Sequence, residues 1–239
     1  MRDVSLAEPV TATTPRPVRR RLMGQRWAEV TFLHWPLDPA VAAPLLPAGT
    51  VPDTLGGVTY VGLIAFRMER VLHTPYFGRF PETNVRLYSV DSQGRRGVVF
   101  LSMEASRLVP VLLARATLAL PYNWARMRLT REGDHVTYAT RRRWGARAAS
   151  AMTIRVGEPV TAPTPLELFL TARWGLHNTA WGRTLHLSNE HPPWPLHRAT
   201  LESLSDELLP AAGLPAPPGP PVSILYSPGV PAVFGPSAS

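Results

Sequence analysis

The sequence predicts an α+β protein that is mainly β and folds as a single domain. Most of its apolar segments are short and alternate apolar with polar residues, which is the period of a half-buried strand. The segments with helical spacing are few and short. No internal repeat and no change of composition divides the chain of 239 residues, of which 45% are hydrophobic and 18% are charged. That length and composition are sufficient for one large hydrophobic core.

The expected elements are mostly strands, with a few helices between them. Residues 1–21 are rich in Pro and polar residues and lack periodicity, so we expect a disordered basic arm there and a single domain over residues 22–236. The expected strands are residues 27–35, 58–66, 84–91, 97–104, 125–131, 135–144, 151–156, 185–187, 196–202, 222–226 and 230–234. The expected helices are residues 38–46, 106–116 and 205–212, and a segment that starts with a capping box at Thr164, Pro165 and Glu167.

Residues 80–127 form the most informative stretch, which is predicted to contain a strand, a turn, a second strand and a short helix. If residues 84–91 are extended, Glu82, Asn84 and Arg86 lie on one face of the strand, and Val85 and Leu87 lie on the other. One interpretation of this polar row is a solvated face with an ordinary ion pair. The other interpretation is that the row lines a polar cavity.

The chain is positively charged, but its charge does not by itself indicate nucleic-acid binding. The formal net charge is +8, and all 25 basic residues are Arg, since the sequence contains no Lys. Phosphate-binding surfaces usually mix both cations. Of the two tightest clusters, residues 19–21 fall on the expected arm. Residues 141–143 fall at the end of a strand, where alternate side chains face opposite ways, so they are not expected to form one patch. The sequence therefore disfavours a nucleic-acid partner.

Composition also limits the compartment and the kinds of site. The chain has no Cys, which excludes disulfides and thiolate metal sites and suits a cytoplasmic protein. No apolar run is long enough to span a membrane, and the N-terminus lacks the apolar core of a signal peptide. The spacing of His186 and His191 fits no metal motif, so we expect no metal site and no cofactor. His191, in the segment HPPWPL, and His34 are expected to be structural.

Three segments of the central stretch, FPETNVRLY, GVVFLSMEA and LPYNWARM, resemble the DUF2071 family of uncharacterised bacterial proteins, the YqjF-like group. The resemblance extends upstream to WAEVTFLHWPLDPAVAAPLLPAG and DTLGGVTYVGLIAFRM, and downstream to HPPWPL and SILYSPGV, so it covers residues 25–234. This family is in turn similar in fold to acetoacetate decarboxylase. The resemblance therefore implies an acetoacetate decarboxylase-like β-barrel or sheet with a few short helices.

The same resemblance implies where a site lies and excludes one mechanism. Acetoacetate decarboxylase forms a Schiff base through a Lys. The Pro-Lys-Lys segment that contains this Lys falls on residues 121–123, which places Tyr122 at the nucleophile position. A phenol cannot form an imine and the chain has no Lys, so Schiff-base decarboxylation is excluded. Glu82 falls near the pocket glutamate of the decarboxylase.

The candidate catalytic residues are Glu82 and Tyr122, and the candidate ligand-binding residues are Glu82, Asn84, Arg86, Arg115 and Tyr122. Arg86 can hold a carboxylate with two parallel hydrogen bonds, and Tyr122 can donate to a carbonyl or enolate oxygen. Glu82 can act as a base if burial raises its pKa. Arg115 is a second expected anion contact. A structural role stays open, because Glu82 and Arg86 can form a buried ion pair and Tyr122 can be a core residue.

The leading functional prediction is a bacterial protein that binds a small acidic or carbonyl-containing molecule in a central cavity. One alternative is a lyase or isomerase in which Glu82 is the acid/base and Arg86 and Tyr122 contact an oxyanion, so the sequence leaves enzymatic activity open. Another alternative is a structural or interaction protein whose cavity is filled by its own side chains. A membrane partner is not expected, and a homo-oligomer stays open. The loop at residues 73–80 and the aromatic residues Tyr76 and Trp194 are interpreted as a surface excursion, a lid or an interface.

Overall fold

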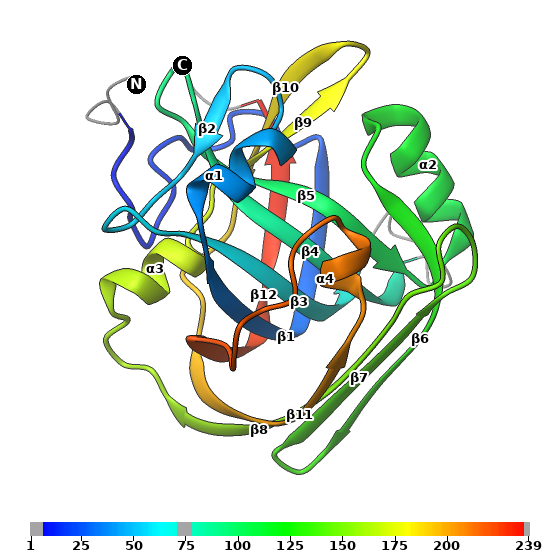
Figure 1. The fold of residues 1–239 in the computed structure, drawn as a ribbon. Helices are drawn as coiled ribbons and strands as arrows, with labels where there is room; N and C mark the ends of the chain where they lie inside the picture. The colour runs from blue at the N-terminus through cyan, green and yellow to red at the C-terminus, as the bar shows by residue number, and fades with distance from the viewer. Residues whose placement is uncertain (1–6, 71–77, 237–239) are drawn as a thin grey trace.

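The computed structural model describes residues 7–70 and 78–236, and this part of the chain contains one sheet of twelve strands (Figure 1). The strands are β1 Met23–Leu37, β2 Thr50–Pro52, β3 Thr59–Glu69, β4 Arg79–Asp91, β5 Arg96–Ala105, β6 Tyr122–Glu132, β7 His135–Arg142, β8 Ala149–Pro159, β9 Gly175–Ala180, β10 Arg183–Glu190, β11 His197–Asp206 and β12 Ser223–Gly235. Their order is β10-β9-β5-β6-β7-β8-β11-β12-β1-β3-β4-β2. Because β4 also pairs with β5 and β10 also pairs with β12, the sheet wraps around and closes on itself.

Short helices connect some of the strands. They are α1 Pro39–Ala42, followed by a 3₁₀ turn at Ala43–Leu45, then α2 Leu108–Leu118, α3 Pro165–Thr171 and α4 Leu208–Ala211. The capping box predicted for α3 is present. The Oγ1 of Thr164 accepts a hydrogen bond from the Glu167 N–H at 3.3 Å, and the Glu167 carboxylate accepts one from the Thr164 N–H at 2.8 Å. The mainly β architecture with few short helices is therefore confirmed.

The expected strands and helices lie where the sequence placed them, with three differences. The strands β2 and β9 were not predicted, because each is short and lacks a clear apolar alternation. The two expected C-terminal strands are one continuous strand, β12. Gly229 makes this continuity possible. It has a φ of 112°, and a Cβ at this position would lie 1.9 Å from the Trp27 carbonyl oxygen of the neighbouring β1.

Residues 7–21 are not a free arm, which corrects part of the expected disordered segment at residues 1–21. The Glu8 N–H donates to the Gly94 carbonyl oxygen at 2.9 Å, and the Glu8 carboxylate forms an ion pair with Arg16. Further along, the Val18 N–H donates to the Glu190 carboxylate at 2.9 Å. These contacts tie the segment to the β4–β5 turn and to β10. The polar composition that suggested disorder instead supplies hydrogen bonds to the domain.

The buried residues form two apolar clusters, and β4 contributes to both because successive side chains face opposite ways. Val85 and Leu87 belong to one cluster, together with residues of β7, β8 and α4. The other cluster contains residues of β1, β3, β5, β9 and β12. Glu82, Asn84 and Arg86 line a cavity within this second set, so the predicted division of the strand into two faces is confirmed.

The three consecutive Arg residues at the end of β7 do not separate as expected. Arg142 pairs with the buried carboxylate of Glu104 at 2.7 Å. Nevertheless Arg141, Arg142 and Arg143 line one surface hollow, together with Arg147. The chain leaves β7 at Arg142 and curls into the turn before β8, so the alternation of a regular strand does not continue to Arg143.

Candidate functional site

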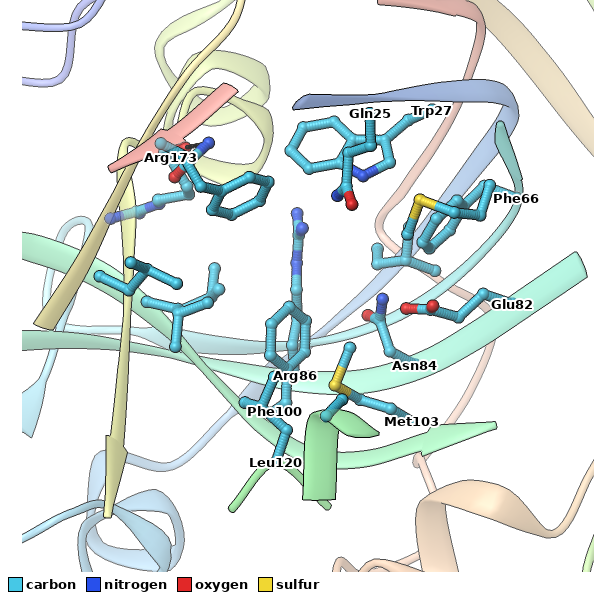
Figure 2. A pocket seen from close by; sticks show the side chains of 18 of the residues that line it. Gln25, Trp27, Phe66, Glu82, Asn84, Arg86, Phe100, Met103, Leu120 and Arg173 are labelled. Carbon is cyan, nitrogen blue, oxygen red and sulfur yellow. Dashed lines mark hydrogen bonds between the residues drawn. The ribbon is translucent and has the colours of Figure 1, made fainter. Parts of the chain in front are cut away.

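A cavity of about 220 Å³ lies inside the wrapped sheet, bounded by strands that are far apart in the sequence (Figure 2). The volume equals roughly seven water molecules, at about 30 Å³ each in the liquid, so a small organic molecule fits. Most of the wall is apolar. The interpretation of a cavity filled by the protein's own side chains is therefore wrong for this structure.

The polar part of the wall comes mainly from β4. Glu82, Asn84 and Arg86 project into the cavity from alternate positions, as Figure 2 shows. Hydrogen bonding to β3 fixes their register, with Glu82 opposite Phe66 and Arg86 opposite Gly62. On the other side of β4 the pairing with β5 is irregular between Val85 and Arg86. The predicted polar row therefore lines a cavity and is not a solvated face.

Glu82 is held as a neutral acid at neutral pH. Its side chain is buried, with a relative exposure of 1%, and it accepts a hydrogen bond from the Tyr122 hydroxyl at 2.9 Å. Burial raises the pKa of Glu82 from 4.5 to about 8, although hydrogen bonds from Tyr122 and Asn84 act in the opposite direction. The charge of the buried Glu104 adds to the rise. A carboxyl group with this pKa carries its proton most of the time at pH 7.

Tyr122 lies at the start of β6 and is nearly buried. Burial, and then the nearby Glu82, raises the pKa of its phenol well above the ordinary value of 10. The phenol is therefore neutral and acts as a hydrogen-bond donor. The structure brings Glu82 and Tyr122 together as the sequence predicted, and the buried Asn84 is beside them. The Oδ1 of Asn84 has no hydrogen-bond partner among the described residues, so this acceptor is available to a ligand.

Arg86 is not paired with Glu82. Its Nη2 donates to the Leu170 carbonyl oxygen at 2.9 Å and to the Tyr88 hydroxyl at 3.2 Å. Its guanidinium carbon lies 5.8 Å from the centre of the Phe32 ring. Within residues 7–70 and 78–236, no carboxylate forms an ion pair with Arg86, so the predicted alternative of a Glu82–Arg86 ion pair is wrong. Figure 2 shows the guanidinium extending into the middle of the cavity.

Arg115 does not contribute to the cavity. It lies in the last turn of α2, its side chain is exposed, and its Nη1 donates to the backbone carbonyl oxygen of Tyr122 at 2.7 Å. The guanidinium therefore binds the backbone of Tyr122 from outside, and Arg115 is not among the residues that line the cavity. The expectation of a second anion contact at Arg115 is not met in this structure.

Arg173 is a lining residue that the sequence analysis missed. It is almost fully buried and pairs with the buried carboxylate of Asp53, which also pairs with Arg96. The Nε of Arg173 donates to the Phe169 carbonyl oxygen at 2.8 Å. Arg173 therefore shares one carboxylate with Arg96, whereas Arg86 has no carboxylate partner among the described residues.

A group of aromatic residues forms another part of the wall. His191 packs between Trp174, at 4.5 Å between ring centres, and Trp194, at 4.9 Å. Trp194 in turn stacks on Trp27 at 5.7 Å. Trp194 is half-buried here and not the exposed aromatic that the sequence suggested, while Tyr76 and residues 73–77 lie outside the described residues. Strand periodicity could not predict this wall, because its members come from distant segments.

His191 is neutral. Its Nδ1–H donates to the Pro192 carbonyl oxygen at 2.7 Å, and burial lowers its pKa to about 4. His34 is buried too, and its Nε2 is 2.6 Å from the Tyr88 hydroxyl. Among the described residues, no group of three or more His, Asp or Glu side chains is placed to hold a metal ion. Of the two Arg residues that line the cavity, Arg86 is the one without a carboxylate partner among the described residues.

Comparison with known proteins places this geometry in a family. Residues 24–231 match the sequence model of DUF2071, described as an uncharacterized conserved protein. The chain belongs to the DUF2071 family. A similar protein is the uncharacterized protein YqjF of Bacillus subtilis (strain 168), which is 31% identical over 203 residues, or 82% of this chain and 84% of YqjF. This confirms the family predicted from the central segments.

Solved structures show that this DUF2071 chain has an acetoacetate decarboxylase-like fold. Acetoacetate decarboxylase from Legionella pneumophila superimposes with a TM-score of 0.58 at 16% identity, over 95% of this chain and 92% of the other. The enduracididine biosynthesis enzyme MppR, complexed with pyruvate, gives a TM-score of 0.61 at 15% identity, over 92% and 90%. At these identities the likeness concerns the fold alone. Within the described residues, no helix has the length and apolar character needed to cross a membrane.

Proposed function

We propose that this DUF2071 protein binds a small organic acid in the cavity and that Arg86 holds the acid's carboxylate. The observation that supports this is the charge of the cavity. Arg86 reaches into an apolar space without an ion-pair partner among the described residues, while Glu82, a carboxyl group of the same strand, is held protonated. A buried cation without a counter-ion is costly, and a ligand carboxylate removes that cost.

The other polar groups suggest what the rest of the ligand offers. The neutral Glu82 carboxyl, which accepts the hydrogen bond of the Tyr122 hydroxyl, can donate its own proton to a carbonyl oxygen, and the free Oδ1 of Asn84 can accept a hydrogen bond from a hydroxyl. An acid that also bears a carbonyl group fits this set. The complex of MppR with pyruvate, a 2-oxo acid, supports the proposal, since that protein shares the fold.

A thermal-shift screen tests the proposal, with acetate, pyruvate and larger 2-oxo acids as probes. At 100 times the Kd, a ligand stabilises the folded state by about 2.7 kcal/mol, which for a protein of this size raises the Tm by roughly 5–10 °C. We expect such a shift in the wild type and its loss in Arg86→Gln. Arg115→Gln is the matched control, because Arg115 lies outside the cavity, and it should keep the shift. An equal shift in Arg86→Gln, or no shift with any acid, contradicts the proposal.

A second candidate function is enzymatic, favoured by the pair of Glu82 and Tyr122. The Glu82 pKa of about 8 allows the group to take up and return a proton near neutral pH. In a lyase or isomerase of this kind, Glu82 in its ionised form removes a proton from the carbon next to a carbonyl. Tyr122 then donates a hydrogen bond to the enolate oxygen that forms.

Proton exchange measures this activity directly. We expect the wild type to exchange the carbon-bound protons of a bound 2-oxo acid with D₂O, as followed by NMR, at a rate that rises between pH 6 and 9. Tyr122→Phe should slow the exchange by roughly 10²–10³-fold, a loss typical of one oxyanion donor. If the wild type exchanges no faster than buffer while the acid is shown to bind, the protein is a binding protein and not an enzyme of this type.

A further inference from the structure

We infer that the acid held by Arg86 is amphiphilic, with its carboxylate inside the cavity and an apolar tail that leaves past Leu113 of α2. This rests on the proposed function, because it assumes a carboxylate at Arg86. It adds the chemical class of the ligand: a carboxylic acid with an alkyl or arylalkyl chain, and not a small, fully polar metabolite. The wall of the cavity, its mouth and the surface outside the mouth support the inference.

Polar residues such as Gln25 and Asn189 also line the cavity, but most of the wall is apolar. Apolar side chains from β1, β3, β5, β9, β10, β12 and α2 make up most of the lining, among them Phe66, Met68, Phe100, Leu176 and Phe234. Burial of apolar ligand surface against such a wall is favourable by about 0.8 kcal/mol per methylene group. A ligand of the size of acetate would leave most of this wall without a partner.

The most exposed of the described lining side chains are on α2, so we place the mouth of the cavity along this helix. Pro110, Leu113, Ala114, Thr117 and Leu118 line the cavity at the spacing of one helix face. Leu113 is 45% exposed and Thr117 is also exposed, whereas the other described lining residues are buried or half-buried. A chain that extends from Arg86 toward solvent therefore passes α2, and it meets an apolar side chain at the opening.

The outer surface next to the mouth is apolar as well. Val109 and Leu112 are each 49% exposed, and they lie on α2 at helical spacing with Leu113. Val111 is the only buried residue of this eleven-residue helix, which has no side-chain N-cap. Exposed apolar side chains that adjoin a cavity mouth are typical of a binding surface. A tail that emerges past Leu113 reaches this surface only after it has left the cavity.

The chain-length dependence of affinity tests the inference. Isothermal titration of the wild type with straight-chain carboxylates from acetate to decanoate, below their critical micelle concentrations, should show the Kd falling roughly fourfold per methylene. The fall should level off once the tail has passed the mouth. The primary alcohols of the same lengths should bind at least about tenfold more weakly, since they lack the charge that Arg86 recognises.

Two neighbouring Glu substitutions on α2 locate the tail. Leu113→Glu places a charge at the mouth. It should remove most of the gain in affinity from butanoate to octanoate, while the Kd of acetate changes less than about twofold. Leu112→Glu is the matched control, because Leu112 is similarly exposed but does not line the cavity. In this variant the Kd should still fall with each added methylene as it does in the wild type. Since both side chains are exposed, neither variant should unfold the protein.

The results distinguish a failure of the inference about the tail from a failure of the proposed function. If acids of every length bind through Arg86 with the same Kd, the inference about the tail is wrong and the proposed function stands. If no acid binds, both fail. If the Kd of Leu113→Glu still falls with chain length as in the wild type, the tail does not leave past α2.

Discussion

Replacement of Asp53 by Asn is expected to lower the free energy of unfolding by about 3–5 kcal/mol, because it leaves the charge of a buried Arg without a counter-ion. Asp53 is fully buried and pairs with both Arg96 and Arg173, and Arg173 is itself almost fully buried. For a chain of this length, that loss corresponds to a fall in Tm of roughly 10 °C. Urea or thermal unfolding at pH 7 measures it.

The matched control for this prediction is Asp134→Asn. The side chain of Asp134 is 54% exposed, and it pairs only with the half-exposed His135 among the described residues. Removal of an exposed ion pair costs at most about 1 kcal/mol. Equal, small effects of the two substitutions would show that Asp53 does not hold the two Arg residues in the way described.

Replacement of Glu82 by Gln is expected to make the protein more stable, and increasingly so as the pH rises. The folded protein holds the Glu82 proton up to a pH of about 8, whereas the ordinary pKa is 4.5. Between these values unfolding releases a proton, so the free energy of unfolding of the wild type falls by about 1.4 kcal/mol per pH unit. The stability that belongs to this group is thus fully present below pH 4.5 and is lost as the pH rises through about 8.

Denaturant titrations at pH 5, 7 and 8.5 check the Glu82 prediction. Gln is neutral at each pH and can still accept the hydrogen bond of Tyr122, so the two proteins should have nearly equal stability at pH 5. At pH 8.5, Glu82→Gln should be more stable than the wild type by about 3–5 kcal/mol. Glu158→Gln, at an exposed position of β8, should differ from the wild type by less than about 0.5 kcal/mol at every pH. A constant difference between Glu82→Gln and the wild type would mean that Glu82 is ionised in the folded state.

Most of the fold could be predicted from local patterns. The alternation in β4 and β5 and the capping box at Thr164 are rules that act over a few residues, and the structure obeys them. The contacts of residues 7–21 could not be predicted, because they depend on partners such as Glu190 that lie far along the chain. The strand β9 was missed for a similar reason, since GLHNTA has no apolar alternation and is extended because β10 and β5 pair with it.

In the candidate site, too, some features could be predicted from local patterns and others could not. The row of Glu82, Asn84 and Arg86 followed from the period of a strand, and the position of Tyr122 followed from the resemblance to the decarboxylases. The hydrogen-bond partners of these side chains could not be predicted. The sequence therefore allowed an ion pair between Glu82 and Arg86, whereas the structure shows a different partner for each. The roles of Arg173 and of the aromatic wall depend on how the sheet closes. Periodicity contains no information about that closure.

The closure of the sheet also determines when the cavity can exist. Arg86 lies in the first half of the chain, but the wall opposite includes Trp194 and, near the other end of the sequence, Phe234 of β12. During synthesis the ribosome therefore releases a chain in which Arg86 is already made but no enclosed space surrounds it. The last strand, β12, pairs with β1 and completes the wall, so the enclosed cavity forms only when folding has finished.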